Sequence, residues 1–308
     1  MESRRVIVTG ATGFIGSRLV RELARRQYEV VVFSRNPARA REKVSGAADY
    51  VAWEPAEHGA WESALDGAGA VVNLAGASVG GKRWNANYKR EIANSRIVGT
   101  RGLVNAIAVA KARPAALVSM SVIGYYGHRD ATPLDESALP GDDFLARVGV
   151  AWEQEARKAE ALGVRVFLPR TGIVLGEAGG ALSLMALPIK CFVGGPIMPG
   201  SQYVSWIHVD DEIAILAQGL DDDRLAGPIN ATAPNPVTNR EFNAALGRAL
   251  GRPSWLPAPG FAVKAVVGEF AESVTTGQRV IPRRLLALGY EFKFPTLDAA
   301  LRDIYGSA

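Results

Sequence analysis

The sequence contains very few of the residues that build metal clusters and disulfides. Among 308 residues there is one cysteine, Cys191, and there are three histidines, His58, His128 and His208. One cysteine excludes an internal disulfide, and the histidines lack the spacing of metal ligands, so we predict no bound metal. Cys191 lies in the apolar run ALPIKCFV, which predicts a buried structural thiol and not a nucleophile.

Long runs of basic or of apolar residues are missing as well. The net charge is +4 without any run of five Lys or Arg residues, which predicts a mild preference for anionic small molecules and argues against a nucleic-acid partner. No segment approaches the ~18 uncharged apolar residues of a membrane span, and the first residues lack the pattern of a signal peptide. With 48% hydrophobic residues, the sequence predicts a soluble cytoplasmic protein with a sizeable core and no membrane partner.

Strand and helix patterns alternate through the first 170 residues. Short apolar runs predict strands at 4–10, 29–35, 48–53, 70–76, 115–121 and 164–176. Amphipathic segments predict helices at 14–27, 37–44, 85–113 and 144–156. Continuous Val, Ile and Leu runs are typical of strands buried on both faces of a parallel sheet. The pattern therefore predicts an α/β fold with a Rossmann-type doubly wound sheet.

After Gly176, glycine and proline cluster, and we expect loops and small elements over the carboxyl ends of the strands, where such sheets bind ligands. A helix is predicted at 210–219 with Asp210 or Asp211 as its N-cap. Thr238 is expected to cap another helix, with Glu241 completing a capping box. We predict a Rossmann domain over residues 1–220 and a smaller α+β region on the substrate side, whose C-terminal helical domain spans 251–299.

The strongest motif is VIVTGATGFIGSRLV, in which Gly10, Gly13 and Gly16 follow the first strand and open the first helix. Glycine at these positions allows a tight turn, close approach of the backbone to a pyrophosphate, and close packing of helix on sheet. The pyrophosphate would meet backbone N–H groups at the positive end of the helix dipole. A glycine turn without a ligand is the alternative, but strand, turn, helix and next strand follow in the order that a dinucleotide site requires.

The end of the second strand favours NADP(H) over NAD(H). An NAD site places Asp or Glu there to bind the ribose 2′-hydroxyl, whereas this sequence has Ser34 and Arg35, followed by Arg39 and Arg41. A hydroxyl and a guanidinium can bind a 2′-phosphate through charge-assisted hydrogen bonds. The alternative is that these arginines are only solvent-exposed residues at the start of a helix, and it applies to Arg41 more than to Arg35.

The motifs together resemble the extended branch of the short-chain dehydrogenase/reductase superfamily, the NAD(P)-dependent epimerase/dehydratase group. The resemblance lies in TGATGFIG at 9–16, NLAG at 73–76, SVIGYYG at 121–127 and WIHVDDEI at 206–213. GGKRWN, NSRIVGT, LPRTGIVLG and the stretch GQRVIPRRLLALGYEFKFPTLDAAL further resemble a subfamily of nucleoside-diphosphate-sugar epimerases with a C-terminal domain of unknown function. The resemblance implies the following cofactor-binding residues: Gly10, Thr12, Gly13, Phe14, Ile15, Gly16, Ser34, Arg35, Leu74, Ala75, Gly76, Glu91, Arg96, Ser121, Pro169 and Arg170.

The superfamily's usual acid/base pair, Tyr-x-x-x-Lys, is missing from the helix FLARVGVAWEQEA. Matching Glu153 to an acid common in the group puts Leu145 at the tyrosine position and Gly149 at the lysine position. The resemblance offers Ser121 and Tyr126 as replacement catalytic residues, with the alternative that Tyr126 and its neighbour Tyr125 only shape the pocket.

Weaker predictions concern the substrate side and the helix packing. Lys82, Arg83 and Trp84 are candidates to hold an anionic substrate, against the alternative of a solvated loop. Gly194, Gly195 and Tyr203 are further substrate-site candidates. The alternative to cofactor binding by Glu91 is an exposed ion pair on its helix. His128 and Asp130 are expected in an exposed loop. Trp152 and Glu153 are expected to pack their helix onto the sheet.

Two functions remain open at this point. The first is an atypical NADP(H)-dependent oxidoreductase or epimerase-like enzyme that acts on a small or nucleotide-linked hydroxyl or carbonyl compound. The second is a non-catalytic NADP(H)-binding regulatory or redox-sensing protein, which the missing dyad favours. A monomer or a homodimer is expected from the resemblance.

Overall fold

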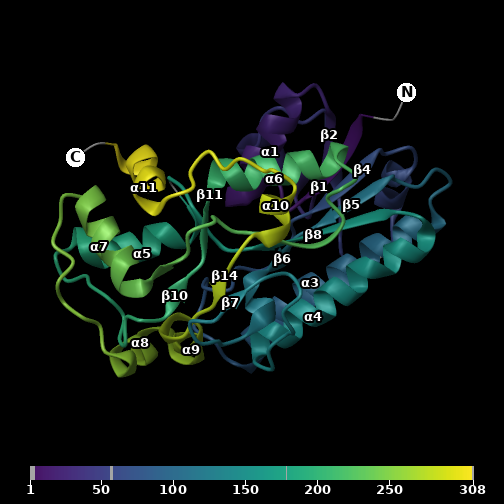
Figure 1. Ribbon diagram of the computed structural model, residues 1–308. Coiled ribbons are helices and arrows are strands. Elements are labelled where there is room, and N and C mark those ends of the chain that lie inside the picture. The colour runs from purple at the N-terminus through teal and green to yellow at the C-terminus, as the bar shows by residue number, and fades with distance from the viewer. Residues whose placement is uncertain (1–3, 56–57, 178, 307–308) are drawn as a thin grey trace.

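A single parallel sheet organises the computed structural model, which describes residues 4–55, 58–177 and 179–306. Its strands run in the order β3-β2-β1-β4-β5-β8-β12, with β6 paired to β8 (Figure 1). Their bounds are β1 Arg5–Thr9, β2 Glu29–Ser34, β3 Asp49–Ala52, β4 Ala70–Asn73, β5 Ala116–Ser119, β6 Ser121–Val122, β8 Arg165–Thr171 and β12 Gly227–Ala231. This order, in which the chain turns back at β1 and continues from β4, confirms the predicted doubly wound Rossmann fold.

Helices cover both faces of the sheet. On one face lie α1 (Phe14–Arg25), α2 (Pro37–Lys43) and α6 (Val209–Asp221), and on the other lie α3 (Ala86–Val109) and α4 (Phe144–Arg157) (Figure 1). The strand β1 shows why both faces are apolar: Val6 and Val8 pack in the α1/α6 core, whereas Ile7 packs in the α3/α4 core. Each residue of the run is therefore buried on one side or the other.

A second region follows β8, and most of it lies on the left of Figure 1. It contains β9 Ile173–Leu175, α5 Gly180–Lys190, β10 Tyr203–Val204, β11 Trp206–His208, β13 Val237–Thr238, α7 Asn239–Ala249, α8 Gly260–Val267, α9 Ala271–Thr275, β14 Arg279–Val280, α10 Arg283–Ala287 and α11 Leu297–Tyr305. The pairing of β14 with β7 (Pro133–Leu134) links it to the first region, whereas β9 pairs with β11 and β10 with β13 inside it. A separate core, centred on the fully buried Trp206 and Phe242, holds α5, α7 and α11 together.

Two local expectations differ from the structure. Loops and small elements were expected after Gly176, yet Gly180–Lys190 is a full helix, α5, because Leu182, Ala186 and Ile189 form a buried helical stripe that offsets the glycine start and Pro188. Cys191 is exposed, not buried, because it follows α5 on the side away from that stripe.

The predicted caps have different outcomes. His208, not Asp210 or Asp211, caps α6, since its ring accepts the Asp210 N–H. The Thr238–Glu241 capping box is confirmed. Over the described residues, no helix combines the length and the apolar character needed to cross a membrane.

Candidate functional site

The glycine turn between β1 and α1 leaves no room for side chains. Gly10 has a φ of +65°, and a β-carbon there would lie 2.6 Å from the Leu74 carbonyl oxygen. At Gly16 it would lie 2.3 Å from the Gly10 oxygen. Helix α1 then starts at Phe14 after Gly13, and no side chain caps it. The backbone N–H groups of this start are thus available to an anion, as a pyrophosphate site requires.

Buried hydrogen bonds hold the end of β4 beside this turn. The Thr9 hydroxyl donates to Asn73 Oδ1 at 2.8 Å and accepts the backbone N–H groups of Leu74 and Ala75 at 3.1 and 3.2 Å. Asn73 Nδ2 in turn donates to Thr100 Oγ1 at 2.8 Å. The predicted cofactor segment 74–76 is therefore fixed against Gly10.

Arg96 lies under the end of that segment. A β-carbon at Gly76 would lie 3.0 Å from Arg96 Cζ, and the guanidinium donates to the carbonyls of Ala77 and Ile92 at 3.0 and 3.1 Å. Only 9% of Arg96 is exposed, and burial lowers its pKa to about 10. No carboxylate of the described residues pairs with it. A desolvated cation without a counter-ion favours an anionic ligand at this place.

Glu91 does not form an ion pair with Arg96. It is exposed and forms an ion pair with Lys82 at 3.4 Å, the arrangement described above as its alternative. Its contact with the cofactor remains a prediction.

The arginines after β2 differ in their contacts. Arg41 lies 3.9 Å from Asp49 and stacks on Tyr50, as expected for a residue of a solvated helix. Arg35 is exposed, and no carboxylate of the described residues contacts it. Ser34 ends β2 beside it. Arg35 is thus available to a 2′-phosphate, as is the exposed Arg39 further along, whereas Arg41 is already paired.

Ser121, Tyr126 and Arg170 come together in one network inside the protein. Arg170 forms a two-fold ion pair with Glu153, with nitrogen–oxygen distances of 2.8 and 2.9 Å, and donates to the Tyr126 hydroxyl at 3.0 Å. Ser121 donates to Glu153 at 2.7 Å, and Tyr126 donates to Asn230 at 2.6 Å. Tyr126 is fully buried, and this burial raises its pKa to about 12.

These contacts bear on the proposed catalytic residues. Because the hydroxyls of Ser121 and Tyr126 have protein partners in the core, a substrate oxygen could reach them only by replacing those partners. Their catalytic role remains a prediction. Glu153 contacts the sheet as expected, through Ser121 and Arg170. The buried Trp152 instead donates to Thr100 of α3, so its packing onto the sheet remains a prediction. Pro169 lies buried in β8 next to Arg170.

A cavity of about 810 Å³ opens between the Rossmann domain and the second region. Leu145, at the position of the missing tyrosine, forms part of its wall, as do Lys82, Arg83, Tyr203, Gly194 and Gly195. The structure thus brings the predicted substrate-side residues together, except Trp84, which is buried and faces a smaller cavity.

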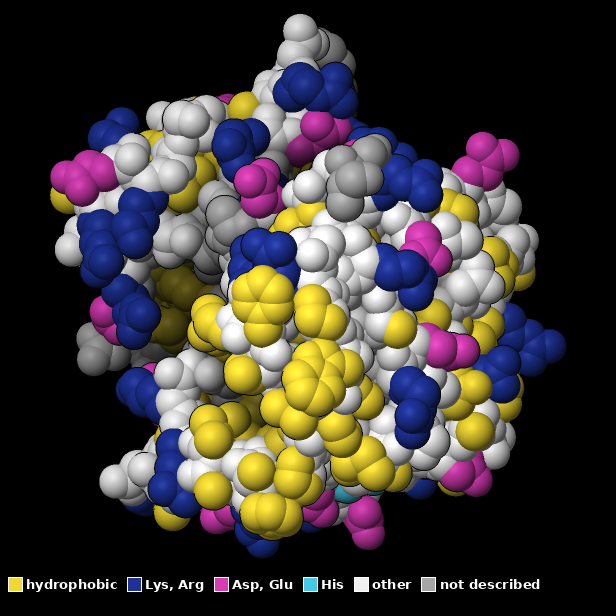
Figure 2. All heavy atoms as spheres, turned by 90° about the vertical axis from the view of Figure 1, so that its left-hand side faces the viewer, with side chains coloured by type: hydrophobic (Ala, Val, Ile, Leu, Met, Phe, Trp, Pro, Cys, Tyr) yellow, Lys and Arg dark blue, Asp and Glu magenta, His cyan; other side chains and the backbone are white. Residues whose placement is uncertain are grey.

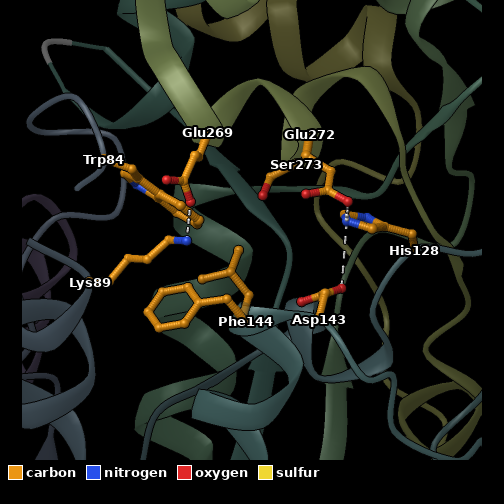
Figure 3. Close-up of a pocket in the computed structure, with 9 residues that line it drawn as sticks. Trp84, Lys89, His128, Asp143, Phe144, Glu269, Glu272 and Ser273 are labelled. Carbon is orange, nitrogen blue, oxygen red and sulfur yellow. Dashed lines mark hydrogen bonds and ion pairs between the residues drawn. The ribbon is translucent and has the colours of Figure 1, made fainter. Parts of the chain in front are cut away.

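The smaller cavity, of about 40 Å³, lies where the C-terminal region docks onto α3 and α4 (Figure 3). Glu269 and Glu272 approach from one side, and Lys89 and Asp143 from the other. Lys89 pairs with Glu269, and the Trp84 ring packs 5.3 Å from the rings of both Phe144 and Phe270. These contacts attach the segment 262–274, which forms part of the wall of the large cavity, to α3 and α4.

His128 lines both cavities and is half-buried, so its prediction as an exposed loop residue was wrong, whereas Asp130 is exposed. Thr276 donates to the Glu272 carbonyl at 2.5 Å and therefore accepts from His128 Nδ1 at 2.6 Å. The other ring nitrogen lies 3.7 Å from Asp143 and 3.6 Å from Glu272. Sequence reasoning missed this position because its partners come from α4 and α9. No group of three or more His, Cys, Asp and Glu in the described chain is arranged to hold a metal.

The fold and sequence are similar to known proteins along the whole chain. The model of the NAD dependent epimerase/dehydratase family matches residues 6–230, and that of a Domain of unknown function (DUF1731) matches residues 258–304. The epimerase family protein SDR39U1 homolog, chloroplastic, of Arabidopsis thaliana is 45% identical over 97% of this chain and 86% of its own length. The Bacillus subtilis epimerase family protein YfhF is 37% identical, with 97% of each chain covered. The crystal structure of the human epimerase family protein SDR39U1 (isoform2) with NADPH superimposes with a TM-score of 0.88 at 37% identity and covers 99% of this chain and 100% of that one.

Proposed function

Because the chain belongs to the NAD dependent epimerase/dehydratase family, we propose that it binds NADP(H) and transfers a hydride to or from a carbonyl or hydroxyl compound held in the large cavity. The observation that carries this proposal is the position of Leu145. It stands where relatives have the catalytic tyrosine, and it forms part of the wall of a cavity of about 810 Å³. Space for a substrate therefore exists beside the place where the family does its chemistry.

The residues present fit NADP(H). At Gly10 and Gly16 the chain packs so closely against other backbone atoms that no β-carbon fits, as the turn of a pyrophosphate site requires. Ser34 and Arg35 would hold the 2′-phosphate, and Arg96 would hold an anionic part of the cofactor near Gly76. The similarity to a human protein crystallised with NADPH supports the same choice. When bound, the cofactor supplies the hydride.

The protein's own part would be to orient the substrate and exclude water. Leu145, Ile123 and Gly124 form an apolar part of the cavity wall, which would keep water from the reacting carbon. Ser121 and Tyr126 are proposed to polarise the substrate oxygen, and this requires that they leave Glu153 and Asn230.

The test is a panel of carbonyl compounds mixed with purified protein and NADPH, followed by the loss of NADPH absorbance. Tyr126→Phe and Ser121→Ala serve as variants. We expect turnover with at least one compound, and a decrease of tenfold or more in kcat in each variant, whereas the Kd of NADPH remains within about twofold. Tight NADPH binding with no turnover across the panel contradicts the enzyme proposal.

The burial of both hydroxyls favours a second candidate, a NADP(H)-binding regulatory or redox-sensing protein without catalysis. Under this proposal, Tyr126→Phe alters stability through Arg170 and Asn230 and changes no rate. A cytoplasmic location, the division into domains at 1–220 and 251–299, and a monomer or homodimer remain predictions from the sequence.

A further inference from the structure

We infer that the large cavity takes an apolar ligand with a single carbonyl or hydroxyl end, such as an alkyl or terpenoid aldehyde or alcohol, and not a nucleotide-linked sugar. The inference rests on the proposed function for the identity of the cofactor and names the substrate class of that same cavity.

Aliphatic side chains make up most of the cavity wall. Helix α5 contributes Leu184, Met185 and Ile189, and α8 contributes Ala262, Val263 and Val266. Moving an apolar ligand from water against such a wall is favourable in proportion to the apolar area that it buries. A sugar hydroxyl placed there would lose its water partners and gain none.

Three of the polar side chains in the wall are already occupied by protein partners. Gln202 donates to two backbone carbonyls at 3.0 and 3.3 Å and accepts a backbone N–H at 2.8 Å. Asn239 Oδ1 accepts a backbone N–H at 2.8 Å and the Asn243 amide at 3.1 Å. Ser205 donates to a backbone carbonyl at 2.8 Å and accepts a backbone N–H at 2.9 Å. These three groups hold the wall together and have little hydrogen-bonding capacity left. The uncharged polar side chains that can meet the polar end of a ligand are therefore Tyr203, Ser273 and Gln278.

The charges in the wall also fit a ligand with one polar end. Among the described lining residues, Lys82 and Arg83 are the basic side chains and Asp143 is the carboxylate, and Lys82 already pairs with Glu91. A nucleotide sugar carries two phosphates and several hydroxyls, and a polar group that is buried without a partner weakens binding. Arg83 can serve one polar end, but the wall cannot serve the whole nucleotide sugar.

The mouth of the cavity is apolar too. Leu184, Val193 and Val266 belong to the wall and are nevertheless 64%, 58% and 77% exposed. Figure 2 shows a broad group of hydrophobic side chains on the face that carries α5 and α8, where Phe261 is also exposed. Apolar surface that continues from outside into a cavity provides an entry path for an apolar molecule.

Equilibrium dialysis of the full chain with NADPH tests the inference, with decanol and UDP-glucose as probes. Ala262→Trp adds an indole to the cavity wall, and Ala265→Trp places the same indole at an exposed position of α8 outside the wall. Ala181→Trp and Ser183→Trp form a second pair on α5, of which only Ala181 lines the cavity. Thermal unfolding of each variant identifies any that misfolds, so that one pair remains interpretable.

We expect decanol to bind, with a Kd at least tenfold higher in Ala262→Trp and Ala181→Trp and unchanged within twofold in the two controls. UDP-glucose should neither bind measurably nor displace decanol. The inference is overturned if UDP-glucose binds and decanol does not, or if decanol binding is the same in cavity variants and controls.

A separate NADPH-oxidation assay with decanal distinguishes the two proposals. Decanol binding that depends on Ala262, without NADPH oxidation, contradicts the proposed enzyme and supports the ligand class. NADPH oxidation with a polar carbonyl compound, without decanol binding, supports the enzyme and overturns the ligand class.

Discussion

Gly149 packs directly against Tyr125: a β-carbon at position 149 would lie 3.4 Å from Tyr125 Cα and 3.5 Å from Tyr125 Cβ. The Tyr125 ring in turn lies against Arg170, whose Cζ is 3.5 Å from the ring centroid. The resemblance described above puts Gly149 at the position of the superfamily's catalytic lysine. A side chain at position 149 would begin in contact with Tyr125, which has the Arg170 guanidinium against its ring.

Restoring the Tyr-x-x-x-Lys pair should destabilise the folded protein at Gly149 but not at Leu145. Gly149→Lys forces its side chain against Tyr125 and brings a second cation towards Arg170, so we expect a loss of about 1–3 kcal/mol in unfolding free energy. Leu145→Tyr lies on the cavity wall and should fold normally. Urea unfolding measures both variants. Gly149→Ala is the control, because a β-carbon there makes only ordinary contacts; equal stability of the Lys and Ala variants would contradict the steric account.

Arg35 should decide between NADP(H) and NAD(H). Arg35→Ala should raise the Kd of NADPH at least tenfold, because it removes a cation from the 2′-phosphate, and leave that of NADH within twofold. Arg41→Ala is the matched control, since Arg41 already contacts Asp49 and Tyr50. Calorimetric titration with both cofactors measures the change. Equal losses for NADPH and NADH would mean that Arg35 does not read the phosphate.

Arg96 should matter more to the complex than to the free protein. Arg96→Met removes a buried cation that has no carboxylate partner among the described residues, so the unfolding temperature without cofactor should fall only slightly. The rise in unfolding temperature on adding NADPH should shrink by half or more, because this rise follows the affinity. Arg101→Met, at an exposed arginine that pairs with Glu155, is the control. An unchanged cofactor-induced rise would place Arg96 outside the site.

Glu212 predicts a pH dependence of stability. Its side chain is fully buried, accepts the Thr171 hydroxyl at 2.9 Å and has one carboxyl oxygen without a hydrogen-bond partner among the described residues. Burial raises its pKa from 4.5 to about 8. Because the folded-state pKa lies above the unfolded one, the folded protein binds the proton more tightly. The stabilisation is complete below the unfolded pKa of 4.5 and is lost as the pH rises to about 8.

Measuring the free energy of unfolding between pH 4.5 and about 8 tests whether Glu212 is the titrating group. The protein should lose up to about 1.4 kcal/mol per pH unit from this group, whereas Glu212→Gln should show a flatter profile. Glu42→Gln, at an exposed position of α2, should retain the original slope. If Glu212→Gln and the control have the same slope, Glu212 is not the titrating group.

The Rossmann sheet and the cofactor cradle were predictable because they depend on residues close together in the sequence. Gly10, Gly13 and Gly16 specify a strand, a turn and a helix start within a few residues, and Arg35 follows its strand directly. Each depends on local backbone geometry and on the rule that parallel strands end at one edge. The sequence also showed that glycine stands at the position of the usual lysine, but it did not show that Tyr125 packs against Gly149.

The substrate side depended on contacts between distant segments. Helix α5 and helix α8 form one cavity wall although about 70 residues separate them. His128 obtains its partners from the segments of α4 and α9. Ser121 and Tyr126 have hydroxyls suited to catalysis, and only folding placed Glu153 and Asn230 against them. The sequence by itself determined which side chains were available and how each local element forms. The tertiary structure decided which of them are buried, paired or left facing a cavity, because burial and pairing depend on packing between elements that no local pattern encodes.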